Sequence, residues 1–243
     1  MNTEIGIWKI YTLGDHAIVF ALDEKVDPKI IHQIMSLHHL IFSKKMNGIL
    51  DSIPSYHTLT IIYNATQFFT SPIHTEAQLF SFANTIINEA IEVVASCIND
   101  DSTITKIPVC YESEYALDIQ NMSIQKNISI KEIVQIHTAK IYEVYSIGFL
   151  PGFAYMGIVD EPIQMLRHEK PRAQVLAGSV GIAGVQTGIY PSNSPGGWQI
   201  IGRTPLKIFD PNPKVLAKFN VGDQIQFYAI TKSEFEKLNE YNN

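Results

Sequence analysis

Residues 173–202 read AQVLAGSVGIAGVQTGIYPSNSPGGWQIIG, and this stretch between Arg172 and Arg203 holds no Asp, Glu, Lys, Arg or His. Seven of its thirty residues are glycine and two are proline, and glutamine and asparagine are also present. This composition excludes a membrane-spanning helix, because it suits neither a continuous helix nor lipid. We predict short strands joined by tight turns, uncharged because they are buried or face a ligand. Any chemistry of the protein is expected beside this stretch.

The sequence around this stretch predicts a mostly-β barrel with one helix packed across it, in a domain of residues 103–232. A strand is expected at 104–111 and another at 224–230. The helix begins at a capping box, Ser129-Ile130-Lys131-Glu132. Residues 233–243 are expected to form a C-terminal tail.

Residues 1–99 show a different order of elements, which predicts a small ferredoxin-like α+β domain. The polar cluster Asn99-Asp100-Asp101-Ser102 marks the boundary between the two domains. The second helix of this domain opens with a capping box at Thr75–Gln78. The expected elements are strands at 5–13, 16–22, 49–53 and 57–63 and helices from Pro28 to Gly48 and from Thr75 to about Ile98. The chain as a whole is therefore expected to be α+β.

The overall composition is that of an ordinary globular protein, with 46% hydrophobic and 17% charged residues. A net charge of −6 argues against nucleic acid or an anionic membrane as the main partner. The two cysteines, Cys97 and Cys110, and the eight histidines lack metal-ligand spacing, so no metal site is expected. The N-terminal residues lack a secretory signal, and a cytoplasmic location is expected.

Two arginines at the ends of the uncharged stretch are candidate functional residues. The guanidinium groups of Arg172 and Arg203 suit carboxylates or phosphates, which a substrate could supply. The alternative is an internal ion pair with Glu112, Glu114 or Asp118. The sequence leaves both interpretations open.

Two histidines and one serine carry weaker signals. His137 lies on the apolar face of its predicted helix, where a histidine is either a core residue or a catalytic one. His168 belongs to a polar loop that could border a pocket. The run Leu176–Gly181 is similar to a hydrolase nucleophile elbow, but β-like residues follow it where that motif needs a helix. Ser179 is therefore interpreted as a turn residue.

The glycines of the stretch match neither a Walker loop nor a Rossmann fingerprint. They either cradle an anion through backbone N–H groups or permit close packing of strands in a small barrel.

Four ordered blocks of sequence resemble the allophanate hydrolase subunit 1 family, which includes the B subunits of 5-oxoprolinase and the kinase inhibitor KipI. The resemblance covers nearly the whole chain. Two departures are visible: Leu176 replaces a usual proline, and residues 167–170 are more polar than is typical. The matching blocks are Pro108–Tyr111, GFLPGFAYMG at Gly148–Gly157, Ala177–Pro191, and Ser194–Trp198 with Ile201–Pro205.

The resemblance implies a ferredoxin-like domain followed by a cyclophilin-like barrel. It also implies an ATP-driven enzyme complex that opens the lactam of 5-oxo-L-proline to L-glutamate, with ATP as co-substrate. In that case the partners are a homologous, KipA-like C subunit together with a separate A subunit. The apolar segment Phe149–Phe153 predicts tight pairing with the C subunit.

The resemblance likewise implies roles for individual residues. Arg203 and Arg172 would stabilise the transferring phosphoryl group, and His137 would shuttle protons. The residues expected to line the substrate site are Ser179, Gln186, Thr187, Tyr190, Gly196, Gly197 and Thr204.

Two other functions share the same blocks. One is KipI-like inhibition of the autophosphorylation of a histidine kinase, which would then be a partner. The other is participation in a urea- or allophanate-processing hydrolase.

Overall fold

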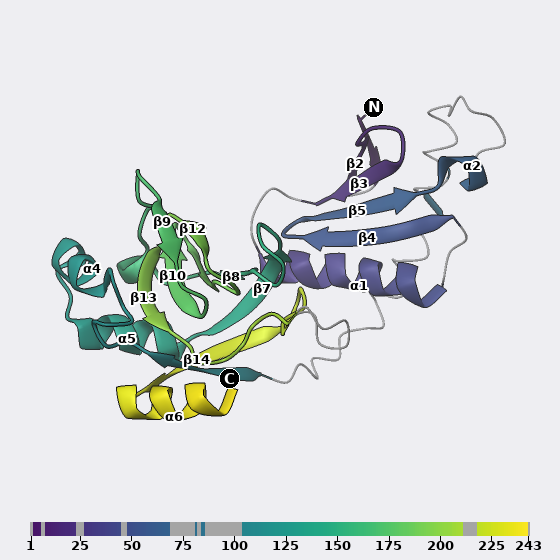
Figure 1. Cartoon of the computed structure of the whole chain (residues 1–243). Helices are drawn as coiled ribbons and strands as arrows, with labels where there is room; N and C mark the ends of the chain where they lie inside the picture. The colour runs from purple at the N-terminus through teal and green to yellow at the C-terminus, as the bar shows by residue number, and fades with distance from the viewer. Residues whose placement is uncertain are drawn as a thin grey trace. The chain divides into compact units, whose positions relative to one another are not determined.

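The computed structural model describes residues 2–5, 8–22, 27–44, 48–68, 81, 84–85, 104–210 and 218–242 (Figure 1). The chain divides into two compact units, residues 1–101 and residues 102–243. The second helix expected in the first unit lies outside the described residues, apart from Ser81, Asn84 and Thr85. The predicted boundary cluster at 99–102 also lies outside them.

The first unit contains a five-stranded antiparallel sheet in the order β1-β2-β3-β5-β4. Strand β5 lies between β3 and β4, which are joined through helix α1. This split β-α-β arrangement is the ferredoxin-like feature that the sequence predicts. The elements are β1 (Asn2–Ile5), β2 (Trp8–Thr12), β3 (Ala17–Ala21), α1 (Pro28–Lys44), β4 (Ile49–Ser55), β5 (Thr58–Tyr63) and α2 (Ala65–Phe68).

One detail of the first unit differs from the sequence prediction. The single strand expected at 5–13 is two strands, because Ile5 at the end of β1 pairs with Trp8 at the start of β2. Helix α1 forms as predicted and packs on β4 and β5. Its side chains Ile31, Ile34 and Leu37 are fully buried at helical spacing.

The second unit is a closed seven-stranded barrel in the order β10-β11-β8-β7-β14-β6-β13. All neighbouring strands are antiparallel except β14 and β6. A separate two-stranded ribbon pairs β12 with β9. The strands are β6 (Thr105–Cys110), β7 (Ile141–Ile147), β8 (Ala154–Gly157), β9 (Arg172–Val175), β10 (Ser179–Ala183), β11 (Gln186–Ile189), β12 (Ser194–Gly196), β13 (Gln199–Arg203) and β14 (Gln224–Ile230).

The uncharged stretch forms strands and turns as predicted, since β9 begins at Arg172 and β13 ends at Arg203. Its glycines permit close packing. A Cβ on Gly188 would lie 2.8 Å from the carbonyl oxygen of Ala154, and one on Gly202 would lie 2.6 Å from Val109 Cγ1. Strands at these positions can approach only because the side chain is missing.

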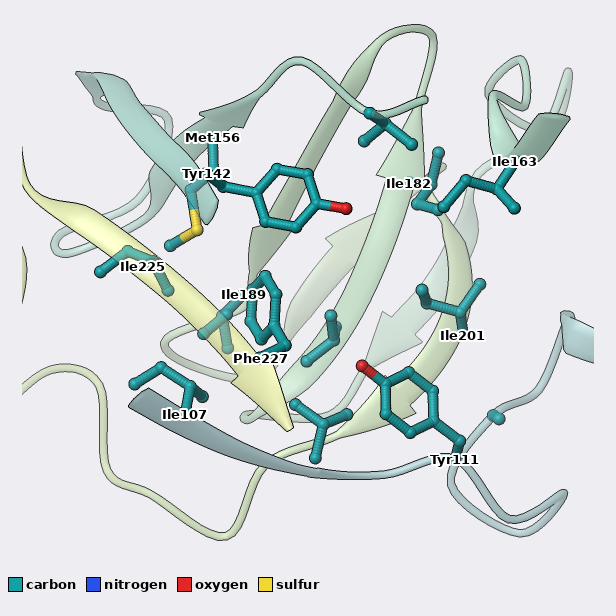
Figure 2. Close-up of a cluster of buried hydrophobic side chains, with 14 of the residues drawn as sticks. Ile107, Tyr111, Tyr142, Met156, Ile163, Ile182, Ile189, Ile201, Ile225 and Phe227 are labelled. Carbon is teal, nitrogen blue, oxygen red and sulfur yellow. The ribbon is translucent and has the colours of Figure 1, made fainter. Parts of the chain in front are cut away.

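Large apolar side chains fill the inside of the barrel, as Figure 2 shows. Tyr142, Met156, Ile189 and Phe227 point into it from four different strands and are at most 1% exposed. The barrel is therefore a packed core, and a ligand has to bind at its rim or on its surface.

The helices of the second unit are more numerous than the one that the sequence predicts. They are α4 (Ile119–Lys126), α5 (Ile130–Ala139), the short 3₁₀ helix η1 (Glu161–Ile163) and α6 (Lys232–Asn242). The capping box at Ser129 is confirmed, with reciprocal bonds between Ser129 and Glu132. The expected C-terminal tail is α6, which contacts β6. The α+β class is confirmed.

Candidate functional site

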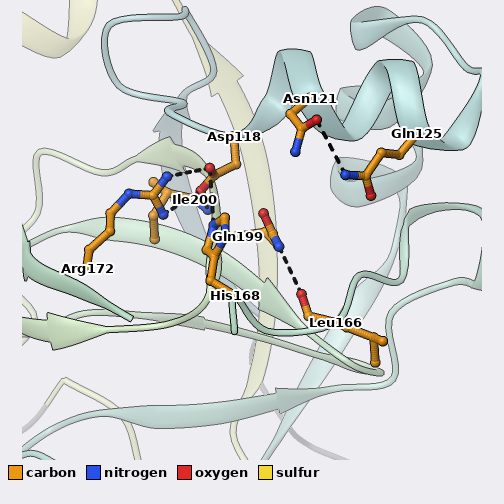
Figure 3. A network of polar contacts seen from close by, with 8 residues as sticks. All are labelled: Asp118, Asn121, Gln125, Leu166, His168, Arg172, Gln199 and Ile200. Atoms are coloured by element: carbon orange, nitrogen blue, oxygen red, sulfur yellow. Dashed lines mark hydrogen bonds and ion pairs between the residues drawn. The ribbon is translucent and has the colours of Figure 1, made fainter. Parts of the chain in front are cut away.

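A buried carboxylate ties the β9–β12 ribbon to the barrel (Figure 3). The side chain of Asp118 is 5% exposed. Arg172 at the start of β9 donates to it twice, from Nη1 to Oδ2 at 3.0 Å and from Nη2 to Oδ1 at 2.5 Å. The backbone N–H of Ile200 donates to Oδ2 at 2.6 Å. A two-pronged guanidinium bond of this kind fixes both partners in one plane.

The position of Asp118 makes this use of its carboxylate notable. Asp118 is the residue that precedes helix α4, where an aspartate usually caps the helix, yet its side chain makes no capping bond. The carboxylate instead binds Arg172 and Ile200, which lie 54 and 82 residues further along the chain. The internal ion pair that the sequence left open is therefore present for Arg172.

Two more polar side chains complete this centre. His168 Nε2 lies 3.3 Å from Asp118 Oδ1, although the two are not aligned as a hydrogen bond. Gln199 is 6% exposed and donates from Nε2 to the carbonyl oxygen of Leu166 at 2.9 Å. Its other amide atom, Oε1, is buried without a hydrogen-bond partner among the described residues. We call Asp118, His168, Arg172 and Gln199 the Asp118 centre.

Arg203 lies at the opposite end of β13 from Gln199 and is partly buried. Its Nε donates to the carbonyl oxygen of Ala177 at 2.8 Å, and its Cζ lies 5.9 Å from the centre of the Phe235 ring of α6. No carboxylate of the described residues lies within 4.0 Å of its guanidinium. Burial lowers the pKa of Arg203, and the interaction with Tyr115 only partly opposes that shift.

The carboxylates that were candidate partners of Arg203 are engaged elsewhere. Glu112 accepts a hydrogen bond from the backbone N–H of Lys232 at 2.9 Å, and Glu114 pairs with the Lys232 side chain. The guanidinium of Arg203 is thus a partly buried cation that can still bind an anion.

Several predicted site residues lie close to Arg203 or to the Asp118 centre. Ser179 lies opposite Arg203 in the β10–β13 register, and the N–H of Thr204 donates to the carbonyl oxygen of Gly178 at 2.9 Å. A Cβ on Gly196 would collide with Tyr190 Oη, so these two residues touch.

Gly196 and Gly197 lie next to members of the Asp118 centre. The carbonyl oxygen of Gly197 accepts from the N–H of His168 at 2.7 Å, and Gly196 pairs with Arg172 in the ribbon. Burial raises the pKa of Tyr190, and a hydrogen bond from the Trp198 backbone opposes that shift. Tyr190 is therefore a neutral, packed side chain at neutral pH.

Other predicted residues lie elsewhere. His137 is fully buried inside the barrel, where its Nδ1 lies 2.7 Å from Tyr111 Oη and its Nε2 lies 3.0 Å from Thr187 Oγ1. Burial lowers the pKa of His137 to about 3. Gln186 is the first residue of β11 and pairs with Ala183. His137 and Thr187 therefore bond to each other inside the barrel, and Gln186 lies next to the turn of the β10–β11 hairpin.

Metal-ligating clusters and membrane-spanning helices are both absent from the described residues. None of their histidine, cysteine and acidic side chains form a group of three that could bind a metal ion. None of the described helices combines the length and apolar character needed to cross a bilayer.

The closed barrel, the split β-α-β unit and the polar centres along β13 define a two-domain α+β protein whose barrel is cyclophilin-like. The family model described as "Carboxyltransferase domain, subdomain C and D" matches residues 8–217. The chain belongs to this family, and the resemblance given by the four sequence blocks is confirmed.

Three of the similar proteins carry the names of enzymes or enzyme subunits. The B subunit of 5-oxoprolinase from Bacillus subtilis (strain 168) is 31% identical over 236 residues, which cover 97% of this chain and 98% of the relative. The protein of the same name from Haemophilus influenzae is 43% identical over 122 residues, 50% of this chain and 57% of its own. The urea amidolyase of Saccharomyces cerevisiae is 34% identical over 79 residues, only 4% of its length.

Solved structures share the fold. The chain aligns with TTHA0988 at a TM-score of 0.72 and 25% identity, covering 88% of this chain and 39% of that one. The conserved uncharacterized protein PH0987 from Pyrococcus horikoshii is 34% identical, with a TM-score of 0.53 and coverage of 93% and 99%. The chain also has the fold of part of the K. lactis urea amidolyase, at a TM-score of 0.70, 19% identity and 15% of that chain. The chain thus corresponds to only a part of TTHA0988 and of urea amidolyase.

Sequence reasoning does not identify two members of the Asp118 centre. The sequence indicates Asp118 only as a partner for arginine, and it does not single out Gln199 as a site residue. Gln199 is one of four glutamine or asparagine residues in the uncharged stretch, so composition alone does not distinguish it.

Proposed function

We propose that this chain is one component of an ATP-dependent complex that hydrolyses 5-oxo-L-proline to L-glutamate and that is active only when all of its subunits are present. The observation that carries the proposal is the end-to-end similarity to the B subunit of 5-oxoprolinase from Bacillus subtilis, over 97% of this chain and 98% of that protein. The proposed partners are a homologous C subunit together with a separate A subunit.

Arg203 is the residue of this chain best suited to bind an anionic group of ATP or of the substrate. Its guanidinium is partly buried, has no carboxylate partner among the described residues and faces the start of β10. A cation in these surroundings is stabilised when an anion binds, and the resulting hydrogen bonds are charge-assisted.

The proposal is tested by reconstitution. The chain is combined with homologues of the A and C subunits from the same organism, and glutamate release from 5-oxo-L-proline and ATP is measured with and without it. We expect release only in the complete mixture. Equal release without this chain, or none from well-assembled components, would contradict the proposal.

The role of Arg203 gives the first mutational prediction. Replacing Arg203 by Met keeps the aliphatic stem but removes the cation, and kcat/KM should fall by about two orders of magnitude. Lys131→Met, on the exposed surface of α5, is the matched control and should change activity little. If the assembly with Arg203→Met kept its activity within twofold of wild type, Arg203 would not be a residue of the site.

A second candidate function is a part in urea or allophanate processing. It is favoured by the 97% coverage of this chain on the fold of K. lactis urea amidolyase. Offering urea or allophanate to the same assembly distinguishes the two, because a 5-oxoprolinase should turn over only the cyclic amide.

A further inference from the structure

The Asp118 centre contains hydrogen-bonding groups that the protein itself leaves unused. The amide oxygen Oε1 of Gln199 is buried and has no partner among the described residues. A buried acceptor without a partner costs free energy, so a group of this kind is either hydrated or reserved for a ligand.

His168 supplies a second acceptor. Its Nε2 lies 3.3 Å from Asp118 Oδ1 without forming a hydrogen bond. The neutral tautomer with its hydrogen on Nε2 avoids placing two lone pairs against each other, and this leaves the lone pair of the imidazole on Nδ1. Nε2 is buried, whereas the whole side chain is 25% exposed. The exposed part is thus Cβ and the remaining atoms of the His168 ring. The nitrogen Nδ1 has no hydrogen-bond partner among the described residues.

Arg172 supplies donors. Each of its two terminal nitrogens uses one N–H on Asp118, and a guanidinium has five N–H groups in total. The side chain is 30% exposed, so the unused N–H groups can reach a ligand. Asp118 therefore holds the Arg172 cation next to the His168 imidazole (Figure 3).

We propose that the Asp118 centre is the recognition site for a cyclic amide that carries a carboxylate. The ring N–H of such a ligand donates to His168 Nδ1 or to Gln199 Oε1, and its carboxylate binds the unused N–H groups of Arg172. Two acceptors and one cation are complementary to a ligand with one N–H donor and one anionic group. Asp118 is a positioning residue.

This inference rests on the proposed function, since 5-oxo-L-proline has both groups. It places recognition of the lactam at the Gln199 end of β13, whereas Arg203 lies at the other end of this strand. Arg203 lies three residues beyond Ile200, or about 10 Å along a strand, so lactam and nucleotide phosphates would occupy neighbouring positions.

The first test measures KM for 5-oxo-L-proline in the reconstituted assembly. His168→Leu removes the acceptor, and KM should rise about tenfold while kcat changes less. His168→Gln can still donate to Asp118 and accept from the ligand, so its KM should stay within a few-fold of wild type. His16→Gln, an exposed histidine of the first unit, is the matched control.

The difference between the two variants separates recognition from a merely structural role. An equal rise of KM in His168→Leu and His168→Gln, or no rise in either, overturns the inference.

A binding measurement keeps this test independent of the reaction. The imidazole ¹H–¹⁵N signals of the ¹⁵N-histidine-labelled chain, in the assembly, are followed during addition of 5-oxo-L-proline or 2-pyrrolidinone. The His168 signal should shift most with 5-oxo-L-proline and less with 2-pyrrolidinone, which lacks the carboxylate. An active assembly whose His168 signal does not move overturns this site alone. An assembly that releases no glutamate overturns the proposed function, and the shift of the His168 signal then still decides the binding site.

Discussion

At the scale of single residues, His137 is a buried histidine whose two ring nitrogens both have hydrogen-bond partners inside the barrel. Thr187 Oγ1 donates to the carbonyl oxygen of Gly181 at 3.0 Å, so it has to accept from His137 Nε2. His137 Nδ1 then accepts from Tyr111 Oη. Every group in this chain of hydrogen bonds has one defined role, which fixes the tautomer of the imidazole. The ring also stacks on Phe227, with centroids 4.6 Å apart.

This burial predicts how stability depends on pH. The pKa of His137 is about 3 in the folded chain, against an ordinary value of 6.5. Between these values the unfolded chain binds a proton that the folded chain excludes, so stability is full above pH 6.5 and declines as the pH falls towards 3. The slope from this group is about 1.4 kcal/mol per pH unit.

The measurement is urea unfolding at pH 7.5, 6 and 5, followed by Trp198 fluorescence in a Trp8→Phe background that removes the other tryptophan. His137→Gln should be less stable at pH 7.5 but should lose less stability on acidification than its parent. Parallel slopes in the two proteins would show that the buried imidazole does not control the acid response.

At the scale of elements, the turn between β9 and β10 depends on one glycine. Gly178 has φ +82°, and a Cβ there would collide with the carbonyl oxygen of Thr204. The turn places Ala177 so that its carbonyl oxygen accepts from Arg203 Nε. The close approach of two backbones therefore positions the guanidinium.

Gly178→Ala and Gly184→Ala form a matched pair for testing this turn. Both positions have positive φ, so each alanine costs about 1–2 kcal/mol of backbone strain. Gly184, with φ +60°, has no heavy atom within 4 Å of its missing Cβ, whereas Gly178 adds the collision with Thr204. The free energy of unfolding should fall more for Gly178→Ala, and only this variant should impair the activity of the assembly. Equal destabilisation would mean that the Thr204 contact is easily relieved.

The elements that the sequence predicted well are those with a local signal. The capping box at Ser129 and the alternating strand at 224–230 depend on residues close in the chain, and both are found at the predicted positions. Helix α4 has only Ile119 and Met122 buried, too few to give an apolar period. Helix α6 did have a signal, since Thr231 and Glu234 bond reciprocally as a capping box.

The candidate site depended on contacts that no local pattern contains. Arg172 and Arg203 looked alike in the sequence as ends of one uncharged stretch, but among the described residues only Arg172 meets a carboxylate, because the fold brings Asp118 to it. Periodicity placed His137 on an apolar helix face, and that face turned out to point into the barrel. Sequence therefore pointed to the uncharged stretch and its flanking arginines but could not assign the partners of these residues.

At the scale of the whole molecule, an exposed aromatic side chain suggests where a partner binds. Phe149 is 65% exposed and has φ +68°, a conformation that is costly for any residue except glycine, asparagine or aspartate. We expect Phe149→Gly to leave the free energy of unfolding unchanged or raise it, because the strain is relieved. Co-purification with the C subunit should nevertheless decrease, because the apolar anchor is lost.

Ile124→Asp is the comparison for Phe149, since Ile124 is 70% exposed on helix α4. Size-exclusion chromatography of the co-expressed proteins should show loss of the heteromer only for Phe149→Gly. If that variant kept its full share of the C subunit, the contact would lie on another surface.

The order of strands in the barrel has a consequence for how the protein is made. Strand β14, from residues 224–230, lies between β6 and β7, which are synthesised much earlier. During translation, β6 and β7 therefore each keep an unpaired edge until β14 is synthesised. Unpaired strand edges favour aggregation. Chaperone dependence during translation should consequently end only when residues 224–230 have left the exit tunnel.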